Sequence, residues 1–343
     1  MNLESYPPLF SELSKSSNQE EYLSSDHHQK VDTVDSIIIK PVVQDSDPIP
    51  VIDLQSLSLD ELGEACEDWG LFRLVNHGVP PSLLNQLQDH AKTLYSLSFQ
   101  SKQALFTTPT SYFWGTPALT PSGAPLSRGL QKINWVEGFN IPISQLSQLQ
   151  PQHPVLASFR LLLEDYGKHL ARLAKTIFEA MAMKLKLDEE QSKSNLSEST
   201  GNIRVYRYPS CSIPDTAWGI DVHTDSSVLS ILYECEVGGL EVLRDDEWFQ
   251  VKPICNALIV NLGDMMQAIS NDNYKSVKHR VKLNKHKERI SICYFVFPDE
   301  DSVIRSSKYK PFTYNDFRAQ VQEDVKTHGF KLGLESFKLT EAL

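Results

Sequence analysis

The sequence predicts a mixed α and β fold in which helices flank a sandwich or jelly roll of short strands. The first observation is a helical period of apolar residues in the first half of the chain. The second is a change of texture from Asn202 onward, where short β-rich runs follow one another. The third is the turn chemistry between these runs, such as Gly238-Gly239 and Gly263-Asp264. Many short strands at close spacing are typical of a sandwich or jelly roll.

Four helices are expected from the apolar periods. In the first, apolar residues recur at helical spacing from Leu59 until Gly70 ends the pattern. A proline begins the second helix, and Gly329 stops the fourth. The third is long and rich in Ala and Leu, and its length suits a brace across the back of a sheet. The expected helices cover residues 59–69, 81–97, 154–187 and 314–328.

The expected strands are short runs rich in β-branched and aromatic residues. They cover residues 48–54, 71–75, 203–208, 228–233, 240–243, 248–251, 257–261, 276–283 and 289–297. Between the second and third helices, residues 106–150 are rich in Pro, Ser and Gly and contain several aromatic residues. A stretch this long with few regular elements is often functional, so it is expected to form a lid or a pocket wall.

Composition bounds the class of protein and of partner. The chain has 343 residues, 41% hydrophobic and 22% charged, which is ordinary for a soluble globular protein with a sizeable core. Its formal net charge of -11 argues against nucleic acid or an anionic membrane as a main partner. It does not exclude a small anionic substrate, because one local Arg or Lys outweighs a distant field that salt screens. A monomer is the expectation, although the sequence leaves the oligomeric state open.

Five cysteines at wide spacing indicate neither a disulfide framework nor a zinc motif, and a reducing compartment fits them. The first residues lack a basic segment followed by an apolar one, so no secretory signal is visible. No run approaches the roughly 20 apolar residues of a membrane span. The expected location is therefore the cytoplasm. Residues 1–47 are rich in Ser, Asp, Glu and Gln, which predicts a mostly loosely ordered extension that can lie over the main body.

A candidate metal site is formed by His223, Asp225 and His279. In a strand or tight turn, residues two apart point the same way, so His223 and Asp225 can face one ion. Two histidines and one carboxylate are the ligands of non-haem Fe(II) oxygenases, which leave the other side of the metal open. A lone H-x-D is weak, since surface turns produce it often. A zinc hydrolase is an alternative, but no partner to activate a water is visible.

The candidate co-substrate contacts follow the second histidine. Arg289 leads a strongly apolar run, and Ser291 lies two residues on, on the same face. The planar donors of an arginine match a carboxylate, and a buried unpaired arginine would be costly. Tyr208, in the run before the metal motif, is a third candidate, although a core tyrosine fits its pattern equally well. Together these residues suggest an enzyme that uses 2-oxoglutarate and dioxygen to oxidise an organic substrate.

With these motifs in hand, the chain resembles plant-type 2-oxoglutarate- and Fe(II)-dependent dioxygenases. The matching segments occur in order from Pro48 nearly to the C-terminus and include EACEDWGLFRLVNHGVP at 64–80, RYPSC at 207–211, HTD at 223–225, VGGLEV at 237–242, YKSVKHRV at 274–281 and ERISICYFVFP at 288–298. The resemblance implies a distorted double-stranded β-helix core. By motif match it makes His223, Asp225 and His279 the iron ligands, and Arg289, Ser291 and Tyr208 the 2-oxoglutarate contacts. Ascorbate is expected to support activity.

The resemblance also implies a division of the chain. Residues 48–343 would form one dioxygenase domain after the extension at 1–47. Within it, 48–198 would be a helical region with the pocket loop, 199–300 the jelly-roll core with the iron site, and 301–343 a C-terminal helix and tail.

Among these enzymes the gibberellin-oxidising branch fits best. YFWGTPALTPS at 112–122 and INWVEGFNIPIS at 133–144 resemble gibberellin 2-oxidases that act on twenty-carbon precursors. Many relatives carry Asn two residues before the tyrosine of the RYP motif, where this chain has Tyr206. The candidate pocket walls are aromatic, with core packing as the alternative for each: Phe113, Trp114, Trp135, Phe139, Tyr206, Phe295 and Phe297. Candidate partners for a substrate carboxylate are Arg204, Arg207 and Lys132.

The implied function is thus the oxidation of a small hydrophobic metabolite, a gibberellin-like carboxylic acid, in plant hormone metabolism. One alternative keeps the chemistry but uses a flavonoid, an alkaloid precursor or another hormone. An alternative of another class is a catalytically silent protein that binds a small ligand. The complete set of six iron and co-substrate residues argues against the silent protein, since a binding protein has no need of all six.

Overall fold

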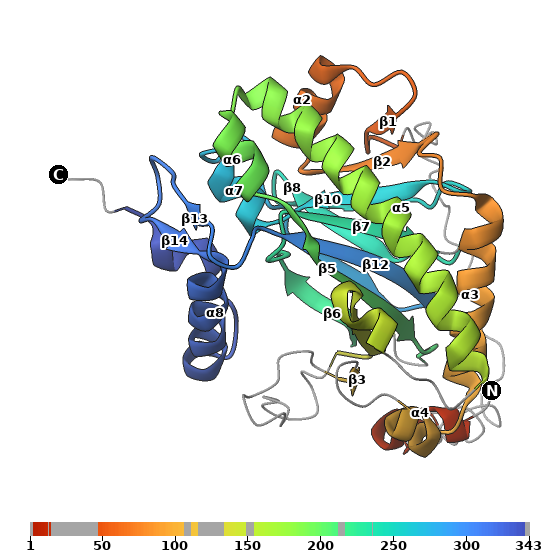
Figure 1. Cartoon of the computed structure of the whole chain (residues 1–343). Helices are drawn as coiled ribbons and strands as arrows, with labels where there is room; N and C mark the ends of the chain where they lie inside the picture. Colours follow the sequence, from red (N-terminus) through yellow and green to blue (C-terminus); the bar gives the residue numbers. More distant parts are fainter. Residues whose placement is uncertain are drawn as a thin grey trace, which may run out of the picture.

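The structure is a computed structural model that describes residues 3–12, 14, 47–105, 111–115, 134–148, 154–211, 217–234 and 236–339. Three layers make up the core, and Figure 1 shows helices packed on one face of a large sheet. A smaller sheet packs on the other face, because residues of both sheets share one buried apolar cluster. Two packed sheets with helices outside form the jelly roll that the sequence predicts.

The large sheet has eight strands in the order β1-β2-β10-β7-β12-β5-β4-β3. The first two pair in parallel, and all other neighbours are antiparallel. Its strands are β1 (Val51–Asp53), β2 (Leu71–Val75), β3 (Ser111–Trp114), β4 (Glu137–Pro142), β5 (Ser197–Tyr208), β7 (Leu229–Glu234), β10 (Leu258–Leu262) and β12 (Arg289–Phe297). Four of these strands begin before residue 197, so the large sheet joins the two regions that the sequence separates at residue 199.

The small sheet has four strands in the order β6-β11-β8-β9. They are β6 (Trp218–His223), β11 (His279–Lys282), β8 (Leu240–Arg244) and β9 (Glu247–Gln250). Val242 and Val281 of this sheet are buried in one cluster with Tyr206, Tyr208 and Phe295 of the large sheet. The space between the sheets is therefore aromatic on the side of the large sheet. A separate pair of short strands, β13 (Val303–Ile304) and β14 (Phe312–Thr313), follows the core.

Helices cover the outer face of the large sheet, and other helices lie near each end of the chain. The longest, α5, runs diagonally across the sheet in Figure 1 and buries residues such as Leu170 and Phe178 in the same cluster as Ile292 and Tyr294 of β12. The helices are α2 (Leu59–Asp68), α3 (Pro81–Ser96), α4 (Phe99–Leu105), α5 (Pro154–Leu185), α6 (Glu189–Ser194), α7 (Asp264–Ile269) and α8 (Tyr314–His328), with short 3-10 turns η1 (Leu3–Ser5), η3 (Ile143–Gln148) and η4 (Gly333–Phe337).

The four predicted helices are confirmed, each within two residues of its expected ends. Their local signals explain this accuracy. The Ser58 side chain accepts a hydrogen bond from the backbone N–H of Glu61 at the start of α2. Thr313 and Asp316 form a reciprocal capping box at the start of α8, and Gly329 ends that helix with a φ of 82°. Strands β3, β4 and β6 were not expected from the sequence.

The first residues of the chain lie over the main body of the protein. Residues 3–12 are ordered against the domain, and Phe10 is completely buried. Its ring stacks on Trp135 at 4.2 Å and meets Trp114 edge-on at 5.8 Å. Residues 3–12 are therefore a part of the extension that lies over the main body, because aromatic packing repays the cost of ordering them. Apart from Ser14, residues 13–46 lie outside the described part of the chain.

Within the described ranges, no helix is both long enough and apolar enough to cross a membrane.

Candidate active site

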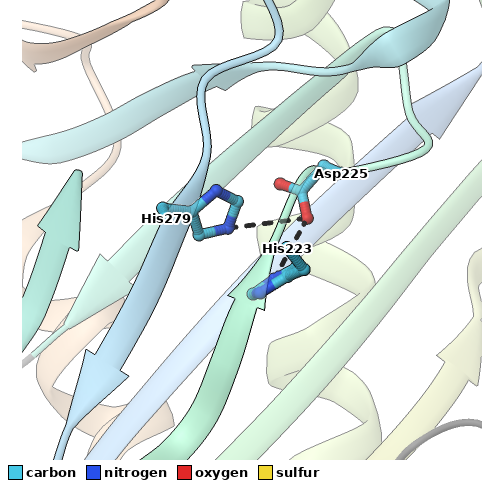
Figure 2. Close-up of side chains that lie close together, drawn as sticks. All are labelled: His223, Asp225 and His279. Atoms are coloured by element: carbon cyan, nitrogen blue, oxygen red, sulfur yellow. Dashed lines mark ion pairs between the residues drawn. The ribbon is translucent and has the colours of Figure 1, made fainter. Parts of the chain in front are cut away.

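The three predicted metal ligands lie together where β6 ends and β11 begins, and Figure 2 shows their side chains close to one another. His223 ends β6 and His279 begins β11, and the two residues are direct partners in the antiparallel ladder. Asp225 lies in the turn just after β6. Its Oδ1 is 3.8 Å from Nε2 of each histidine, and the three ligand atoms all lie within 4.8 Å of one another. This spacing lets all three side chains bind a single ion.

Backbone contacts fix which nitrogen of each histidine faces the ion. Nδ1 of His223 lies 2.7 Å from the carbonyl oxygen of Asp221, and Nδ1 of His279 lies 3.1 Å from that of Val277. A carbonyl oxygen only accepts, so each Nδ1 carries the hydrogen and donates it. Each Nε2 is then left with its lone pair toward Asp225, which is the form a metal requires.

The carboxylate of Asp225 is oriented by polar residues of the large sheet. Its Oδ2 accepts hydrogen bonds from the Ser230 hydroxyl and the Asn261 amide, both at 2.7 Å. Oδ1 is therefore the oxygen that faces the histidines. Outer hydrogen bonds of this kind hold metal ligands in place and tune them. Sequence reasoning missed both residues, although Asn261 stood out as a polar residue inside the apolar run of β10.

The turn between the ligands is held from the C-terminal end of the chain. Lys331 Nζ donates to the carbonyl oxygen of Thr224 at 2.6 Å and pairs with Asp264 Oδ2 at 2.7 Å. The backbone N–H of Asp264 in turn donates to the carbonyl oxygen of Asp225 at 2.8 Å. A residue more than 100 positions away thus fixes the backbone between two ligands. No pattern in the sequence pointed to Lys331.

The electrostatics of the site favour the ionisation states that bind a metal. Burial, reinforced by the neighbouring His279, lowers the pKa of His223 to about 3, so its imidazole is neutral at pH 7. Burial alone would raise the pKa of Asp225. The two histidines and the hydrogen bonds from Ser230 and Asn261 outweigh it and lower that pKa to about 2. A neutral imidazole and an ionised carboxylate are the forms in which histidine and aspartate side chains bind a metal ion.

These shifts predict how the metal-free protein responds to acid. The unfolded chain protonates His223 near its ordinary pKa of 6.5, whereas the folded chain keeps it neutral to about 3. The stability that this residue contributes is therefore present above pH 6.5 and is lost as the pH falls toward 3. The limiting slope is about 1.4 kcal/mol per pH unit, and the 31% exposure of the side chain makes the real slope smaller. Urea unfolding between pH 7 and 4 with a chelator should show a shallower slope for His223→Ala; equal slopes would contradict the assignment.

The predicted co-substrate contacts also come together, on the inner face of the large sheet. Arg289 and Ser291 lie on one face of β12, and Tyr208 is the ladder partner of Arg289 on β5. All three are buried, and the Arg289 guanidinium lies over the Tyr208 ring at 4.8 Å. Arg289 Nη1 is 3.3 Å from the Ser291 hydroxyl. Burial raises the pKa of Tyr208 to about 12, so its hydroxyl keeps its hydrogen. The group presents a cation and two hydroxyls.

A further residue at this place was missed by sequence reasoning. The carboxylate of Glu234, at the end of β7, accepts from Arg289 Nε at 2.8 Å and from Nη2 at 2.5 Å. Both side chains are 3% exposed. The sequence indicated only that a buried Arg289 needs a partner. The partner comes from a strand 55 residues earlier in the chain, and the ladder places Glu234 opposite Ser291.

The donors present fit a metal and a dicarboxylate. Two imidazole nitrogens and one carboxylate oxygen converge from one side, as in non-haem Fe(II) sites. A buried arginine beside a serine and a tyrosine matches the far carboxylate of 2-oxoglutarate. A structural zinc site needs four protein ligands. Among the described residues, the cluster consists of His223, Asp225 and His279, without a fourth His or Cys.

Six of the seven predicted aromatic wall residues lie in or against the buried cluster that holds Tyr208: Phe113, Trp114, Trp135, Tyr206, Phe295 and Phe297. The ladder puts Phe113 on the same face as Tyr206, whereas Trp114 is the next residue of β3 and takes the other face, where it meets Phe10. Phe297 stacks on Tyr314 of α8 at 4.6 Å. Tyr206 meets Phe113 edge-on at 5.9 Å, across Gly138, where a Cβ would come within 2.4 Å of the Phe113 ring. Tyr206 and Phe113 thus pack against each other on the inner face of the large sheet.

Phe139 lies in the core, which is the alternative that the sequence left open for each of these residues. It is fully buried on the opposite face of β4, where it stacks on Tyr95 at 5.0 Å within the helix-side core. The β4–β5 ladder places Gly138, not Phe139, opposite Tyr206. Since successive residues of a strand point to opposite faces, the side chain of Phe139 cannot line the same space as Phe113.

The three candidate partners of a substrate carboxylate differ in whether they already have an ion-pair partner. Arg207 is 2% exposed, and its Nε donates to Glu137 at 2.5 Å, so it is already paired. Lys132 lies outside the described residues. Arg204 lies on the inner face, with Nε bonded to the Asn140 side chain at 3.0 Å and its guanidinium over the Phe295 ring at 5.1 Å. Among the described residues, no carboxylate forms an ion pair with it.

The sequence matches two protein-family models and several curated relatives. Residues 199–298 match the family model of the 2OG-Fe(II) oxygenase superfamily, and residues 49–157 match that of the non-haem dioxygenase in morphine synthesis N-terminal region. The chain is 36% identical to Gibberellin 2-beta-dioxygenase 8 of Arabidopsis thaliana, covering 88% of this chain and 90% of the relative. It is 34% identical to Gibberellin 2-beta-dioxygenase 6 of Oryza sativa subsp. japonica, covering 84% of each.

Solved structures agree with the fold. The crystal structure of JOX2 in complex with 2OG, Fe and JA has a TM-score of 0.72 at 29% identity, covering 85% of this chain and 89% of that one. The crystal structure of the dioxygenase for auxin oxidation in rice has a TM-score of 0.68 at 26% identity, covering 85% and 100%.

Proposed function

Because this chain belongs to the 2OG-Fe(II) oxygenase superfamily, we propose that it hydroxylates a gibberellin-like carboxylic acid. The enzyme class is that of a 2-oxoglutarate- and Fe(II)-dependent dioxygenase. The overall reaction of this class consumes one dioxygen and one 2-oxoglutarate, and yields succinate, carbon dioxide and a substrate in which one C–H has become C–OH. The substrate is the part that the proposal adds.

Each part of the protein has a defined task in this reaction. His223, Asp225 and His279 would hold the iron, which supplies the oxidising chemistry when bound. Ser230 and Asn261 keep Oδ1 of the aspartate toward the metal. The protein itself contributes orientation and exclusion of water, and the carbon that is hydroxylated depends on which C–H the walls hold nearest the metal.

The Arg289 pocket would hold the far carboxylate of 2-oxoglutarate. Its guanidinium lies over the Tyr208 ring, 4.8 Å from the ring centre, and the Ser291 hydroxyl lies 3.3 Å from Nη1. A planar arginine with an adjacent hydroxyl recognises one end of a dicarboxylate and leaves the 2-oxo acid end directed toward the metal.

The single observation that carries the substrate proposal is Arg204. It is a cation on an aromatic inner face, with its guanidinium over Phe295 and no ion-pair partner among the described side chains. Aromatic walls suit a rigid apolar ring system, and one cation suits one carboxylate. Gibberellins combine both features. Four curated relatives named as gibberellin 2-beta-dioxygenases, at 32–36% identity, support this choice.

The direct test is to incubate the enzyme with Fe(II), ascorbate and 2-oxoglutarate and a panel of acids, and to identify products by mass spectrometry. The panel contains twenty-carbon and nineteen-carbon gibberellins, jasmonic acid, an auxin and flavonoids. A gain of one oxygen on gibberellins, with matching succinate, would support the proposal. Turnover confined to flavonoids, or to the jasmonate or auxin, would sink it. If no compound stimulates succinate release from an iron-loaded protein, the silent-binder alternative gains support.

Arg204→Gln is expected to raise the KM for the acid substrate by about tenfold to a hundredfold, the range for a lost charge-assisted contact. The KM for 2-oxoglutarate should not change, because Arg204 is not part of the Arg289 group. Steady-state kinetics with each substrate varied in turn separates the two. Arg305→Gln, at an exposed arginine, is the matched control. Equal effects on both KM values would mean that Arg204 only supports the fold.

A further inference from the structure

The Arg289 pocket contains an acid that its expected ligand does not require. Glu234 forms two contacts with the guanidinium through Oε2, at 2.8 and 2.5 Å. Its other oxygen, Oε1, is buried and has no hydrogen-bond partner within the described structure. The pair is almost inaccessible, with 3% exposure on each side. An unpaired buried carboxylate oxygen is costly, so this arrangement calls for a reason beyond packing.

The immediate consequence concerns charge. The positive charge of Arg289 is already balanced by Glu234 before any co-substrate arrives. A dicarboxylate that binds there brings a second anion to the same guanidinium, at low effective dielectric. Repulsion between two buried carboxylates around one cation then offsets part of the attraction. A ligand with an uncharged far end would meet no such repulsion.

Geometry keeps the two roles of the guanidinium apart. Glu234 contacts the Nε and Nη2 edge, whereas Nη1 is on the side of Ser291, at 3.3 Å from its hydroxyl. The guanidinium carbon lies 4.8 Å from the centre of the Tyr208 ring. The carboxylate of Glu234 therefore fixes the rotation of the guanidinium so that Nη1 and the Ser291 hydroxyl form one donor pair. The negative charge of Glu234 also cancels the positive charge of Arg289, so the two donors attract an anion less strongly.

We propose that Glu234 is a positioning residue that aims Arg289 while weakening its hold on the far carboxylate of 2-oxoglutarate, so that the pocket discriminates little against 2-oxo acids with an uncharged far end. The inference rests on the co-substrate site of the proposed function and is independent of the organic substrate. It assigns to this chain a co-substrate specificity set by an Arg–Glu pair, not by an arginine alone.

The test compares binding of 2-oxoglutarate with that of 2-oxoglutaramate, in which the far carboxylate is replaced by an amide. Isothermal titration calorimetry on the Fe(II)-loaded protein, without oxygen, gives both dissociation constants without relying on turnover. Glu234→Gln keeps an oxygen that accepts from Arg289 but removes the charge. It is expected to bind 2-oxoglutarate about tenfold more tightly and the amide with little change. Discrimination between the two should therefore rise about tenfold.

Two further variants make the result decisive. Glu236→Gln removes the same charge from an exposed residue two positions on and should leave both constants unchanged. Glu234→Met, uncharged and of similar length, should shift discrimination in the same direction as Glu234→Gln if the latter folds poorly. An unchanged ratio in the Glu234 variants, or weaker binding of 2-oxoglutarate by both, would overturn the inference. If the wild-type protein binds neither ligand, the co-substrate site is overturned together with this inference. If the protein binds them but does not oxidise gibberellins, only the substrate proposal fails.

Discussion

Replacing His223 by alanine is expected to lower substrate-dependent succinate formation by more than about a hundredfold. Loss of an outer partner of a metal ligand already costs 10–100-fold, and loss of a ligand costs more. Only His279 and Asp225 would remain, and their Nε2 and Oδ1 atoms, 3.8 Å apart, offer the ion two protein contacts. The variant should also retain far less iron, as measured by elemental analysis of the protein after exposure to a weak chelator.

The control for this variant is His286→Ala, because His286 is an exposed histidine outside the site. It should keep wild-type iron content and turnover. The fold of His223→Ala should survive, since 31% of that side chain is exposed and His223 is not part of either buried apolar cluster. A folded His223→Ala protein that still releases succinate at the wild-type rate would show that the metal is bound elsewhere.

The three candidate metal ligands could be found from the sequence because two of them form a short linear motif. His223 and Asp225 are two residues apart, and the residues that follow His279 include Arg289 and Ser291 on one strand. Their partners were not predictable. Glu234 and Lys331 reach the site through strand pairing and the return of the C-terminal segment, and neither leaves a local pattern.

The sequence also could not tell which aromatic rings face the space between the sheets. Phe113 and Phe139 both looked suitable, because the aromatic stretch has no clear alternation of apolar and polar residues. Only the register of β3 on β4 and of β4 on β5 decides which face each ring takes. Strand β6 was missed for a related reason, since Trp218–His223 is an edge strand with exposed positions and a mixed sequence. The four predicted helices, whose signals are local, end within two residues of the expected positions, whereas the short helices α4, α6 and α7 were missed.

Replacing Glu137 by alanine is expected to destabilise the protein by about 3–5 kcal/mol, the cost of leaving buried charges without their partner. Glu137 is fully buried on β4 and pairs with Lys102 at 2.5 Å, with Arg207 Nε at 2.5 Å and with the Tyr112 hydroxyl. Without it, Lys102 keeps its hydrogen bond to the carbonyl oxygen of Ser5. Arg207 keeps its hydrogen bonds to Ser5, but its nearest carboxylate is then the more distant Glu288, at 3.8 Å. Urea unfolding at pH 7 measures the loss, which is a large part of the 5–15 kcal/mol typical of a folded domain.

The matched control is Glu189→Ala, which breaks an ion pair whose two side chains are 83% and 75% exposed and should cost at most about 1 kcal/mol. The response of the Glu137 variant to pH gives a second check. Burial already lowers the pKa of Lys102 to about 8, and the nearby Glu137 opposes that shift. Its removal should lower the pKa further, so that the lysine gives up its proton within the folded state at neutral pH. A folded-state pKa below the unfolded value means that stability rises with pH up to about 10.5.

The same network links stability to the pocket. Lys102 and Arg207 Nη2 both donate to the carbonyl oxygen of Ser5, at 2.6 and 3.0 Å, and so hold the segment whose Phe10 packs on Trp114 and Trp135. Glu137→Ala should therefore release this segment and expose the two tryptophans before the domain unfolds. Tryptophan fluorescence and limited proteolysis near residues 3–12, at urea concentrations below the main transition, detect that step. A single transition with both probes coincident would mean that the segment and the domain unfold as one unit, and that the ionic network is part of the common core.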